Sequence, residues 1–336
     1  MKRKYLILII IMMFLVVGCG KKDNNNDNGS SNNTNGNISY VAVNEDYVLM
    51  LTNKGDLYAY GSYAGYASKE KITGSPKVIA SNVKKVINND ISIYYIDSNN
   101  KLYYVGNGVQ GGGTSSFEYV TDNVIDGSVQ NNFCSLYVKS DGVYREGIFG
   151  DYCGWDSNYN SIEKINISNV KKVIAGNYYS GYIDNNNNLY LAGSKRLLQN
   201  NYTGESYNLF LTNVKDVSNN YVLTNNGEVY YIAKTYDESG NKFEAVKIGT
   251  NGQKLYDEVY LANNKLYYCY LCNQTRGKLY ELKYTDVKEH YYGKSDSKLV
   301  YLNNNNKIVL ASDVDNSILD LSTNSMKKIY DFLQTK

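Results

Sequence analysis

The sequence predicts an all-β fold of about seven similar units, a seven-bladed β-propeller. First, a pair of strand-like runs joined by a polar turn recurs along the chain and is clearest at residues 83–106. Second, this pair returns at spacings of 37 to 46 residues, about 42 on average. Third, the chain has 37 Tyr and a single Pro, and Tyr favours strands that are half exposed to water.

The unit at residues 83–106 shows why each element is expected. Residues 91–96 are apolar, β-branched and aromatic, which is typical of a strand. Residues 97–100 are Asp, Ser and Asn, whose short side chains bond their own backbone and tolerate left-handed geometry, so a turn follows. Residues 102–105 form the returning strand. Its first two residues mark the repeats: Leu57-Tyr58, Leu102-Tyr103, Val143-Tyr144, Leu189-Tyr190, Val229-Tyr230, Leu266-Tyr267 and Ile308-Val309.

Two further runs complete the unit. An Asn-Val-Lys-Lys-Val segment precedes the strand pair, as at residues 82–86 and 169–173, and another strand-like run precedes that segment. Each unit can therefore supply four strands, which is one propeller blade. We expect the first repeat to lack its leading strand and the spare run at residues 317–322 to complete it, which would leave no open sheet edge.

The N-terminus has the features of a bacterial lipoprotein signal. Three basic residues precede an apolar run at residues 5–17, which is shorter than the ~20 residues that a membrane span needs. The run ends in Val-Val-Gly-Cys, which resembles the lipobox; the alternative is a short membrane anchor with a chance Cys. The resemblance implies that Cys19 carries a diacylglyceryl group, so we expect an exported protein anchored to the outer face of the bacterial cell membrane.

The chain thus divides into four expected parts. Residues 1–18 are the signal peptide, 19–37 an Asn-rich tether, 38–322 the β-propeller of about seven repeats, and 323–336 a C-terminal tail. The net charge is +2, with Lys and Arg scattered among the repeats. A nucleic-acid partner is therefore not expected, and neither is oligomerisation, so we expect a monomer.

One segment resembles a known repeat. Residues 44–61, NEDYVLMLTNKGDLYAYG, resemble the repeat of the regulator of chromosome condensation family, with its alternating Leu, Thr-x-x-Gly, Leu-Tyr, aromatic and closing Gly. The His-Ser pair of that family is absent, and Tyr60 stands where Trp is usual. The resemblance covers roughly residues 38–322 and implies the propeller fold. It carries over no functional residue and does not imply exchange-factor activity. A secreted inhibitor of β-lactamase uses the same fold as a binding surface.

Residues that could carry chemistry are few. His290, the single histidine, stands at the repeat position of Val86 and Val173, which favours a structural role. Asp184 to Asn188 resemble a calcium loop, but the equivalent residues of other repeats are turns and a distal bidentate carboxylate is missing. We therefore expect no metal, no cofactor and no enzymatic activity.

Four cysteines follow Cys19. Cys134 and Cys153 share the third repeat and are the expected disulfide pair, since export permits such bonds. Cys269 and Cys272 lie three residues apart, and on a flat strand such positions point to opposite faces. A disulfide between them would need a turn or bulge, and packed free thiols are the alternative.

The expected binding face lies where the repeats differ in length, directly after the Gly that ends each returning strand. Equivalent insertions in a ring project from one side, and aromatic and Arg side chains dominate interface energies. The alternative is that these rings pack the loops onto the propeller rim. The candidate residues are Tyr63, Tyr66, Phe149, Tyr152, Trp155, Tyr159, Arg196 and Tyr202.

These features predict an extracytoplasmic lipoprotein whose propeller binds a protein or a glycan. Its partners would be the membrane, through the lipid on Cys19, and this ligand. One alternative is an enzyme on a propeller scaffold that acts on envelope or host glycans. Another is a structural assembly protein of the cell envelope.

Overall fold

The chain divides by its internal contacts into a unit Met1–Asn32 and a unit Asn33–Lys336, and the description below concerns the second unit alone. The computed structural model describes residues 38–43, 47–62, 71–88, 92–108, 113–130, 133–148, 153–155, 158–176, 179–193, 207–237, 240–256, 259–270, 272, 278–282, 286–292, 299–305 and 308–311. The expected signal peptide, tether, C-terminal strand (317–322) and tail lie outside these residues. Among the described residues, no helix has the length and hydrophobicity that crossing a bilayer requires.

The described strands form seven antiparallel sheets, six of four strands and one of three. The expected all-β class is thereby confirmed. The first sheet comprises β1 (Ile38–Val43), β2 (Tyr47–Thr52), β3 (Leu57–Ser62) and β4 (Lys71–Ala80). The second comprises β5 (Val83–Asn88), β6 (Ser92–Asp97), β7 (Leu102–Asn107) and β8 (Gly113–Thr121). The third comprises β9 (Val124–Gln130), β10 (Cys134–Lys139), β11 (Gly142–Gly147) and β12 (Tyr159–Ile165).

The remaining sheets repeat this order. The fourth comprises β13 (Val170–Gly176), β14 (Tyr179–Asp184), β15 (Leu189–Gly193) and β16 (Asn208–Leu211). The fifth comprises β17 (Val214–Ser218), β18 (Tyr221–Thr224), β19 (Val229–Asp237) and β20 (Gly240–Gly249). The sixth comprises β21 (Gly252–Leu255), β22 (Val259–Ala262), β23 (Lys265–Tyr270) and β24 (Lys278–Glu281), and the seventh β25 (Val287–Tyr292), β26 (Leu299–Asn303) and β27 (Ile308–Ala311).

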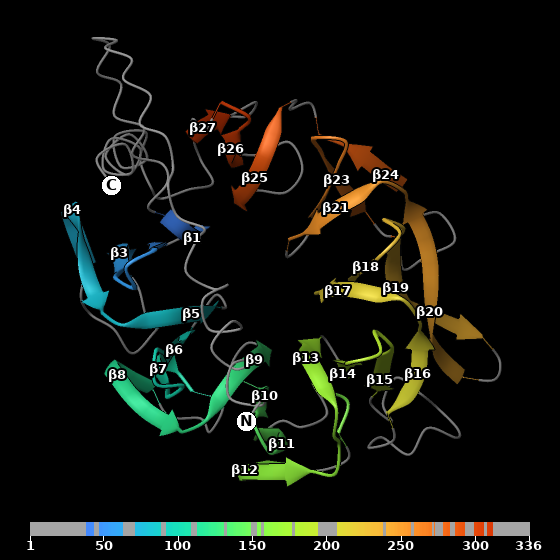
Figure 1. Ribbon diagram of the computed structural model, residues 1–336, viewed down its shortest axis with the longest axis horizontal. Helices are drawn as coiled ribbons and strands as arrows, with labels where there is room; N and C mark the ends of the chain where they lie inside the picture. Colours follow the sequence, from blue (N-terminus) through green and yellow to red (C-terminus); the bar gives the residue numbers. More distant parts are fainter. Residues whose placement is uncertain are drawn as a thin grey trace, which may run out of the picture. The chain divides into compact units, whose positions relative to one another are not determined.

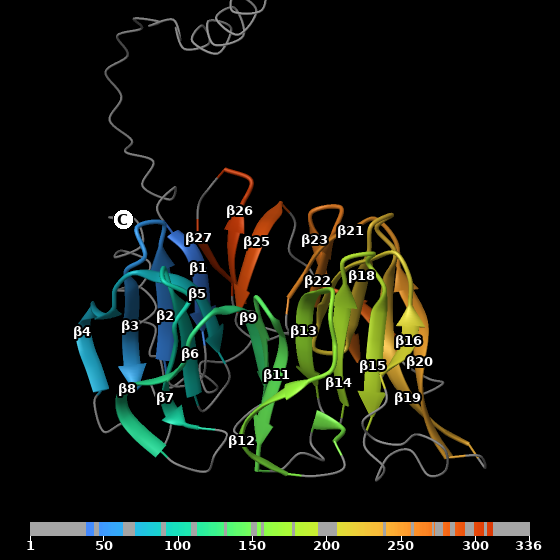
Figure 2. The same cartoon turned by 60° about the horizontal axis from the view of Figure 1, so that its bottom comes forward.

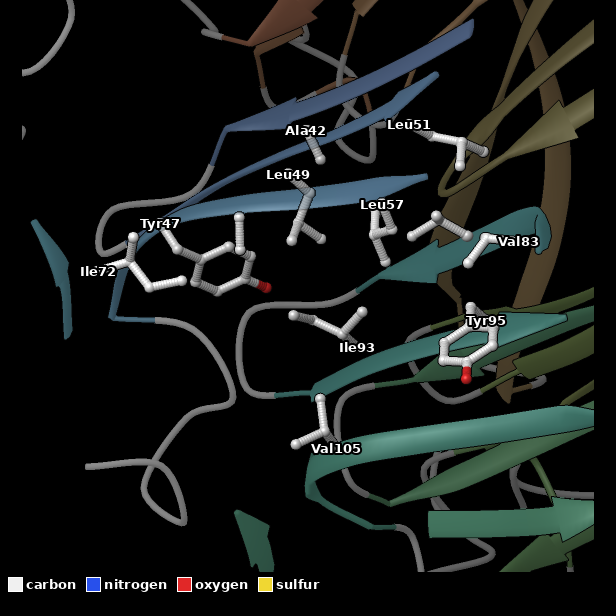
Figure 3. Close-up of a cluster of buried hydrophobic side chains, with 12 residues drawn as sticks. Ala42, Tyr47, Leu49, Leu51, Leu57, Ile72, Val83, Ile93, Tyr95 and Val105 are labelled. Atoms are coloured by element: carbon white, nitrogen blue, oxygen red, sulfur yellow. The ribbon is translucent and has the colours of Figure 1, made fainter. Parts of the chain in front are cut away.

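The sheets follow one another around a centre, with the first strand of each sheet innermost (Figure 1). Each sheet from the first to the sixth shares a buried apolar cluster with the next. The innermost strand of the first sheet, β1, also contacts the innermost strand of the seventh, β25. Between the first two sheets, Leu49 and Leu57 pack with Val83, Ile93 and Val105 (Figure 3). Because both faces of the middle strands are covered in this way, β2 is buried along its whole length and its sequence is continuously apolar.

Adjacent sheets are joined at one end by a repeated set of backbone hydrogen bonds. The N–H of Val83, the first residue of β5, donates to the carbonyl of Gly55 in the β2–β3 turn (2.9 Å), and the N–H of Ser98 donates to Asn82 (2.8 Å). The same bonds recur where Val124 donates to Asn100 (2.8 Å). We call this end the turn face; it carries the turns between second and third strands and the short links between sheets, at the top of Figure 2.

Left-handed backbone explains why the turn face is rich in Asn. The turn position of Gly55 (φ +85°) is held by Asn100 (φ +61°) in the second sheet and by Asn187 (φ +63°) in the fourth. The residue before each inner strand from β5 to β25 is also left-handed, as at Asn82 (φ +60°) and Asn213 (φ +59°). Gly and Asn are the residues that adopt this region at least cost, so the Asn-rich turns are a structural requirement of the ring.

The predicted phase of the repeat, meaning the strand with which each sheet begins, was wrong. The first sheet already has four described strands, with β1 in the innermost position, so it lacks no leading strand for residues 317–322 to replace. Each of the first six sheets instead begins with the strand equivalent to the Asn-Val-Lys-Lys-Val segment and ends with the run that was expected to lead the next unit. The pattern of runs along the chain is the same in either phase. The pairing of β4 with β3, in the same sheet, instead of with β5 distinguishes the two phases.

Candidate functional site

The end opposite the turn face has connections of very different lengths. There the third strand of each sheet runs into the fourth through residues 63–70, 108–112, 148–158, 194–207, 238–239 and 271–277. The turns on the other face are two to four residues long. We call this end the insert face; it lies at the bottom of Figure 2.

Two of the eight candidate binding residues lie in described parts of the chain. These are Trp155 and Tyr159, which belong to the connection between β11 and β12 and to the start of β12. The structure therefore locates only this part of the expected face. The other six lie outside the described residues: Tyr63, Tyr66, Phe149, Tyr152, Arg196 and Tyr202.

Trp155 packs inside the domain between the third and fourth sheets. Its side chain is 1% exposed and belongs to a cluster with Val173 and Ala175 of β13. Its indole Nε1 donates a hydrogen bond to Ser180 Oγ on β14 (3.1 Å), and Ser180 also bonds the hydroxyl of Tyr207 (2.9 Å). The indole therefore has both its apolar surface and its polar atom satisfied within the protein.

This placement corrects the assignment of Trp155 to a binding surface. An indole ring that is almost fully buried offers no contact surface to a partner unless the protein partly unfolds. The alternative stated above, that the rings pack their loops onto the propeller, describes Trp155. Tyr159 is half-buried and meets Trp155 edge to face, with 5.7 Å between ring centroids, so it belongs to the same packed cluster.

A disulfide also attaches the segment that contains Trp155 to the third sheet. Cys134, the first residue of β10, is bonded to Cys153, as the shared repeat predicts. Between Cys153 and Trp155, Gly154 has φ +78°. A Cβ there would lie 2.8 Å from the carbonyl oxygen of Ala192 on β15, so only Gly allows this close approach. The segment Cys153–Trp155 thus fixes the middle of the longer connection against the fourth sheet.

Arg145 is part of this cluster and was not predicted. Its guanidinium carbon lies 3.6 Å from the ring centroid of Tyr159 and 5.6 Å from that of Trp155, and the residue is 8% exposed. A cation over aromatic faces is stabilised most where water is excluded. The sequence does carry a signal, since Arg145 and Glu146 interrupt a strand whose equivalents elsewhere are Tyr104 and Val105, or Leu191 and Ala192.

Glu146 occupies the opposite side of β11, toward the second sheet. Its Oε1 accepts a hydrogen bond from the Tyr137 hydroxyl (2.5 Å) and another from Ser135 Oγ (3.3 Å). Burial, reinforced by the charge of Glu146, raises the pKa of Tyr137 well above its usual value, so this hydroxyl remains a donor. Ser135 and Tyr137 are fully buried, and no substrate can reach the trio in this conformation. We interpret it as a structural network.

The other residues considered from the sequence have ordinary surroundings. Asp184 Oδ1 accepts the N–H groups of Asn186 (2.9 Å) and Asn188 (2.7 Å), which is the hydrogen bonding of a turn. His290 lies on β25 opposite Tyr301, the register that Val86 has with Tyr95. Cys269 and Cys272 are joined by a disulfide, with Cys272 in a turn beyond β23. No group of three metal-ligating side chains occurs in the described ranges.

Solved structures with a similar fold exist. Human WBSCR16 aligns with a TM-score of 0.51 at 16% identity, covering 65% of this chain and 69% of its own. Prp20p from Saccharomyces cerevisiae, described with its binding properties to Gsp1p and histones, aligns at 0.56 and 13% identity, covering 75% and 78%. Yeast RCC1 (Prp20) in the structure bound by Kap60 aligns at 0.51 and 12% identity, covering 79% and 77%.

These similarities establish an RCC1-like β-propeller fold for this chain. The family resemblance noted at residues 44–61 is thereby supported at the level of fold. No known protein family matches the sequence, and no curated protein matches it either. At 12 to 16% identity the similarity concerns the fold alone, so no activity follows from it.

Proposed function

We propose that this chain is a membrane-anchored extracytoplasmic lipoprotein, and that its closed seven-bladed propeller binds a protein or a glycan through the insert face. The observation that supports binding is the difference between the two faces. Connections on the insert face range from two residues (238–239) to fourteen (194–207), whereas turns on the other face are two to four residues long and several are hydrogen-bonded to the neighbouring sheet. Variable loops on a rigid scaffold are a common form of binding surface.

The Trp155 cluster supports this proposal indirectly. Trp155, Arg145 and the disulfide of Cys153 hold the connection 148–158 at its middle. A loop held at an internal point loses less conformational entropy when a partner orders the rest, which favours binding. The aromatic and Arg side chains that we assign to recognition are therefore those that precede this point and those in the neighbouring connections: Tyr63, Tyr66, Phe149, Tyr152, Arg196 and Tyr202.

Capture experiments with matched variants test the binding face. A chain beginning at Lys21 is presented to fractionated cell-envelope protein and glycan. Two variants carry changes on the insert face, Y63S with Y66S and R196Q with Y202S. The control carries Y119S with Y280S, two tyrosines of outer strands that are 52% and 41% exposed. We expect at least a tenfold loss of capture in the first two and none in the control. Equal capture by all three would exclude this face, and protease treatment of the captured material separates protein from glycan.

The anchor is tested separately. Replacing Cys19 with Ala should abolish labelling by a radioactive fatty acid and leave the unprocessed precursor, because the acyl chains are attached through its sulfur. Substituting Cys134, which is not in a lipobox-like context, serves as the control and should leave labelling intact. Labelled Cys19→Ala protein would refute the anchor without bearing on the binding face.

A further inference from the structure

Lysines recur at one position of the innermost strands, at the turn face, and we call them the lysine row. The second residue of the innermost strand is Lys84 in β5, Lys171 in β13, Lys215 in β17 and Lys288 in β25, and all four are exposed. These positions are equivalent because each follows the left-handed residue that links two sheets. The repeat therefore places four positive charges at one end of the ring.

Within the described part of the chain, three of these lysines contact neutral hydrogen-bond acceptors and no carboxylate. Lys84 Nζ donates to the side-chain oxygen of Asn100 (2.8 Å), and Lys171 Nζ donates to that of Asn187 (3.0 Å). Lys215 Nζ lies 3.4 Å from the backbone oxygen of Gln253. Each acceptor is a neutral amide oxygen, which orients the ammonium group and leaves its positive charge in place.

The next residue of the same strands behaves differently. Lys85 forms an ion pair with Asp126 of β9, and Lys172 forms one with Asp216 of β17 (2.5 Å). These pairs join neighbouring sheets, so the third position of the inner strand serves the ring itself. Among the described residues, Lys84, Lys171 and Lys215 at the second position form no such ion pair, and they are exposed at the turn face.

The chain also enters the propeller at this face. Ile38 begins β1 and pairs with Thr52, as Val83 begins β5 and pairs with Asp97, so Ile38 lies at the turn-face end of its strand. Whatever precedes residue 38 therefore joins the propeller beside the lysine row. Ile125, at the equivalent second position of β9, is 48% exposed and adds an apolar side chain to this row.

We infer that the turn face docks on an anionic lipid surface through Lys84, Lys171 and Lys215, whose ammonium groups would lie against lipid phosphates. This inference rests on the proposed anchor at Cys19, which would keep the propeller at the membrane and make weak contacts sufficient. A lipid surface fits better than a soluble anion because the charges are spread around one end of the ring and lie beside the point where the anchored segment joins it.

Vesicle binding tests the inference. The chain from Lys21 retains every described strand, since these lie between Ile38 and Ala311. It is sedimented with vesicles of phosphatidylcholine, with or without phosphatidylglycerol. We expect binding only to the mixed vesicles, lost at high salt. Near an anionic surface each lysine contributes about fivefold, so K84Q with K171Q should bind roughly 25-fold more weakly, and adding K215Q should bring the loss to roughly 100-fold.

The control changes the same net charge elsewhere. K71Q with K77Q removes two exposed lysines from β4, an outer strand, and should alter vesicle binding by about twofold or less. Melting temperatures within about 2 °C of the parent show that the variants are folded. Three results would overturn the inference: no binding to mixed vesicles, equal losses in the test and control variants, or binding to inorganic polyphosphate without binding to vesicles. Fatty-acid labelling at Cys19 reports on the anchor independently of all three.

Discussion

Replacing Trp155 with Ala should lower the free energy of unfolding by about 3–5 kcal/mol, the usual cost of removing a fully buried Trp side chain. The side chain is 1% exposed and fills the space between the third and fourth sheets, so its loss leaves a cavity beside Val173 and Ala175. The disulfide at Cys153 still holds the backbone of the segment, which limits how far the cavity can collapse.

Two further variants separate the hydrogen-bond contribution of Trp155 to stability from its packing contribution. Trp155→Phe keeps an aromatic ring against Arg145 but loses the Nε1 hydrogen bond to Ser180 (3.1 Å), so we expect about 1–2 kcal/mol. Ser180→Ala leaves the indole N–H and the Tyr207 hydroxyl without this partner, and we expect about 1–3 kcal/mol. Because both changes remove the same bond, the double variant should cost less than the sum of the two.

The measurement is urea unfolding followed by far-ultraviolet circular dichroism, because Trp155 is the only Trp and its fluorescence disappears with it. Capture of envelope material is measured in parallel. An unchanged midpoint for Trp155→Ala, together with weakened capture, would refute the packing argument and return Trp155 to the binding face. A lowered midpoint with intact capture agrees with the structure.

Three other predictions concern a turn residue, an ion pair between two sheets and two tyrosine hydroxyls. Asn187→Ala should cost about 1–2 kcal/mol more than Asn187→Gly, measured by urea unfolding, because φ is +63° there and Gly adopts this region freely. A double-mutant cycle of Lys85→Gln and Asp126→Asn should give a coupling of about 1 kcal/mol or less, since the Lys side chain is 43% exposed. Burial, with the charges of neighbouring groups, raises the pKa of Tyr95 and Tyr182 to about 12. The unfolded chain releases these protons near pH 10, so the stability that the two neutral hydroxyls contribute is complete below pH 10 and is lost as pH rises toward 12, which melting temperature against pH will show.

Each of these predictions has a contrary outcome. Equal stability of the two Asn187 variants would mean that the turn does not need left-handed geometry. A Lys85–Asp126 coupling that vanishes at low salt would remove the pair from the forces that join the second and third sheets. Tyrosinate absorbance that rises fully near pH 10 while the protein stays folded would show that the two hydroxyls are accessible to base.

The fold could be predicted from the sequence because its signals are local. A left-handed turn favours Gly or Asn, a strand covered on both faces is largely apolar, and these two signals recur along the described repeats. The phase of the repeat could not be predicted, because the same sequence of runs fits sheets that begin with either strand. Phase depends on whether a strand such as β4 pairs with the strand before it, β3, or with the strand after it, β5, and that is a tertiary property.

The candidate site was predicted less well, for a different reason. Aromatic side chains favour both interfaces and packed clusters, and composition alone does not distinguish them. What distinguishes Trp155 is its set of neighbours, Ser180 on the next sheet and Arg145 on its own, and the sequence does not show that these side chains meet. The change from apolar residues to Arg145 and Glu146 in the repeat was the available signal, and it indicates a buried polar cluster.

The two faces of the ring differ in how their sequences can vary. This difference suggests how ligand binding at one face and lipid binding at the other can occur together. Inserting residues at the turn face would disturb bonds such as that between Val83 and Gly55, so its turns stay within two to four residues, and lysines at the second position of the inner strands vary its side chains instead. The connections on the insert face vary from two to fourteen residues. Strands of about six residues separate the faces by ~20 Å, so a ligand held by the loops would not compete with a lipid surface at the lysines. Vesicle-bound protein should therefore capture its ligand with undiminished affinity.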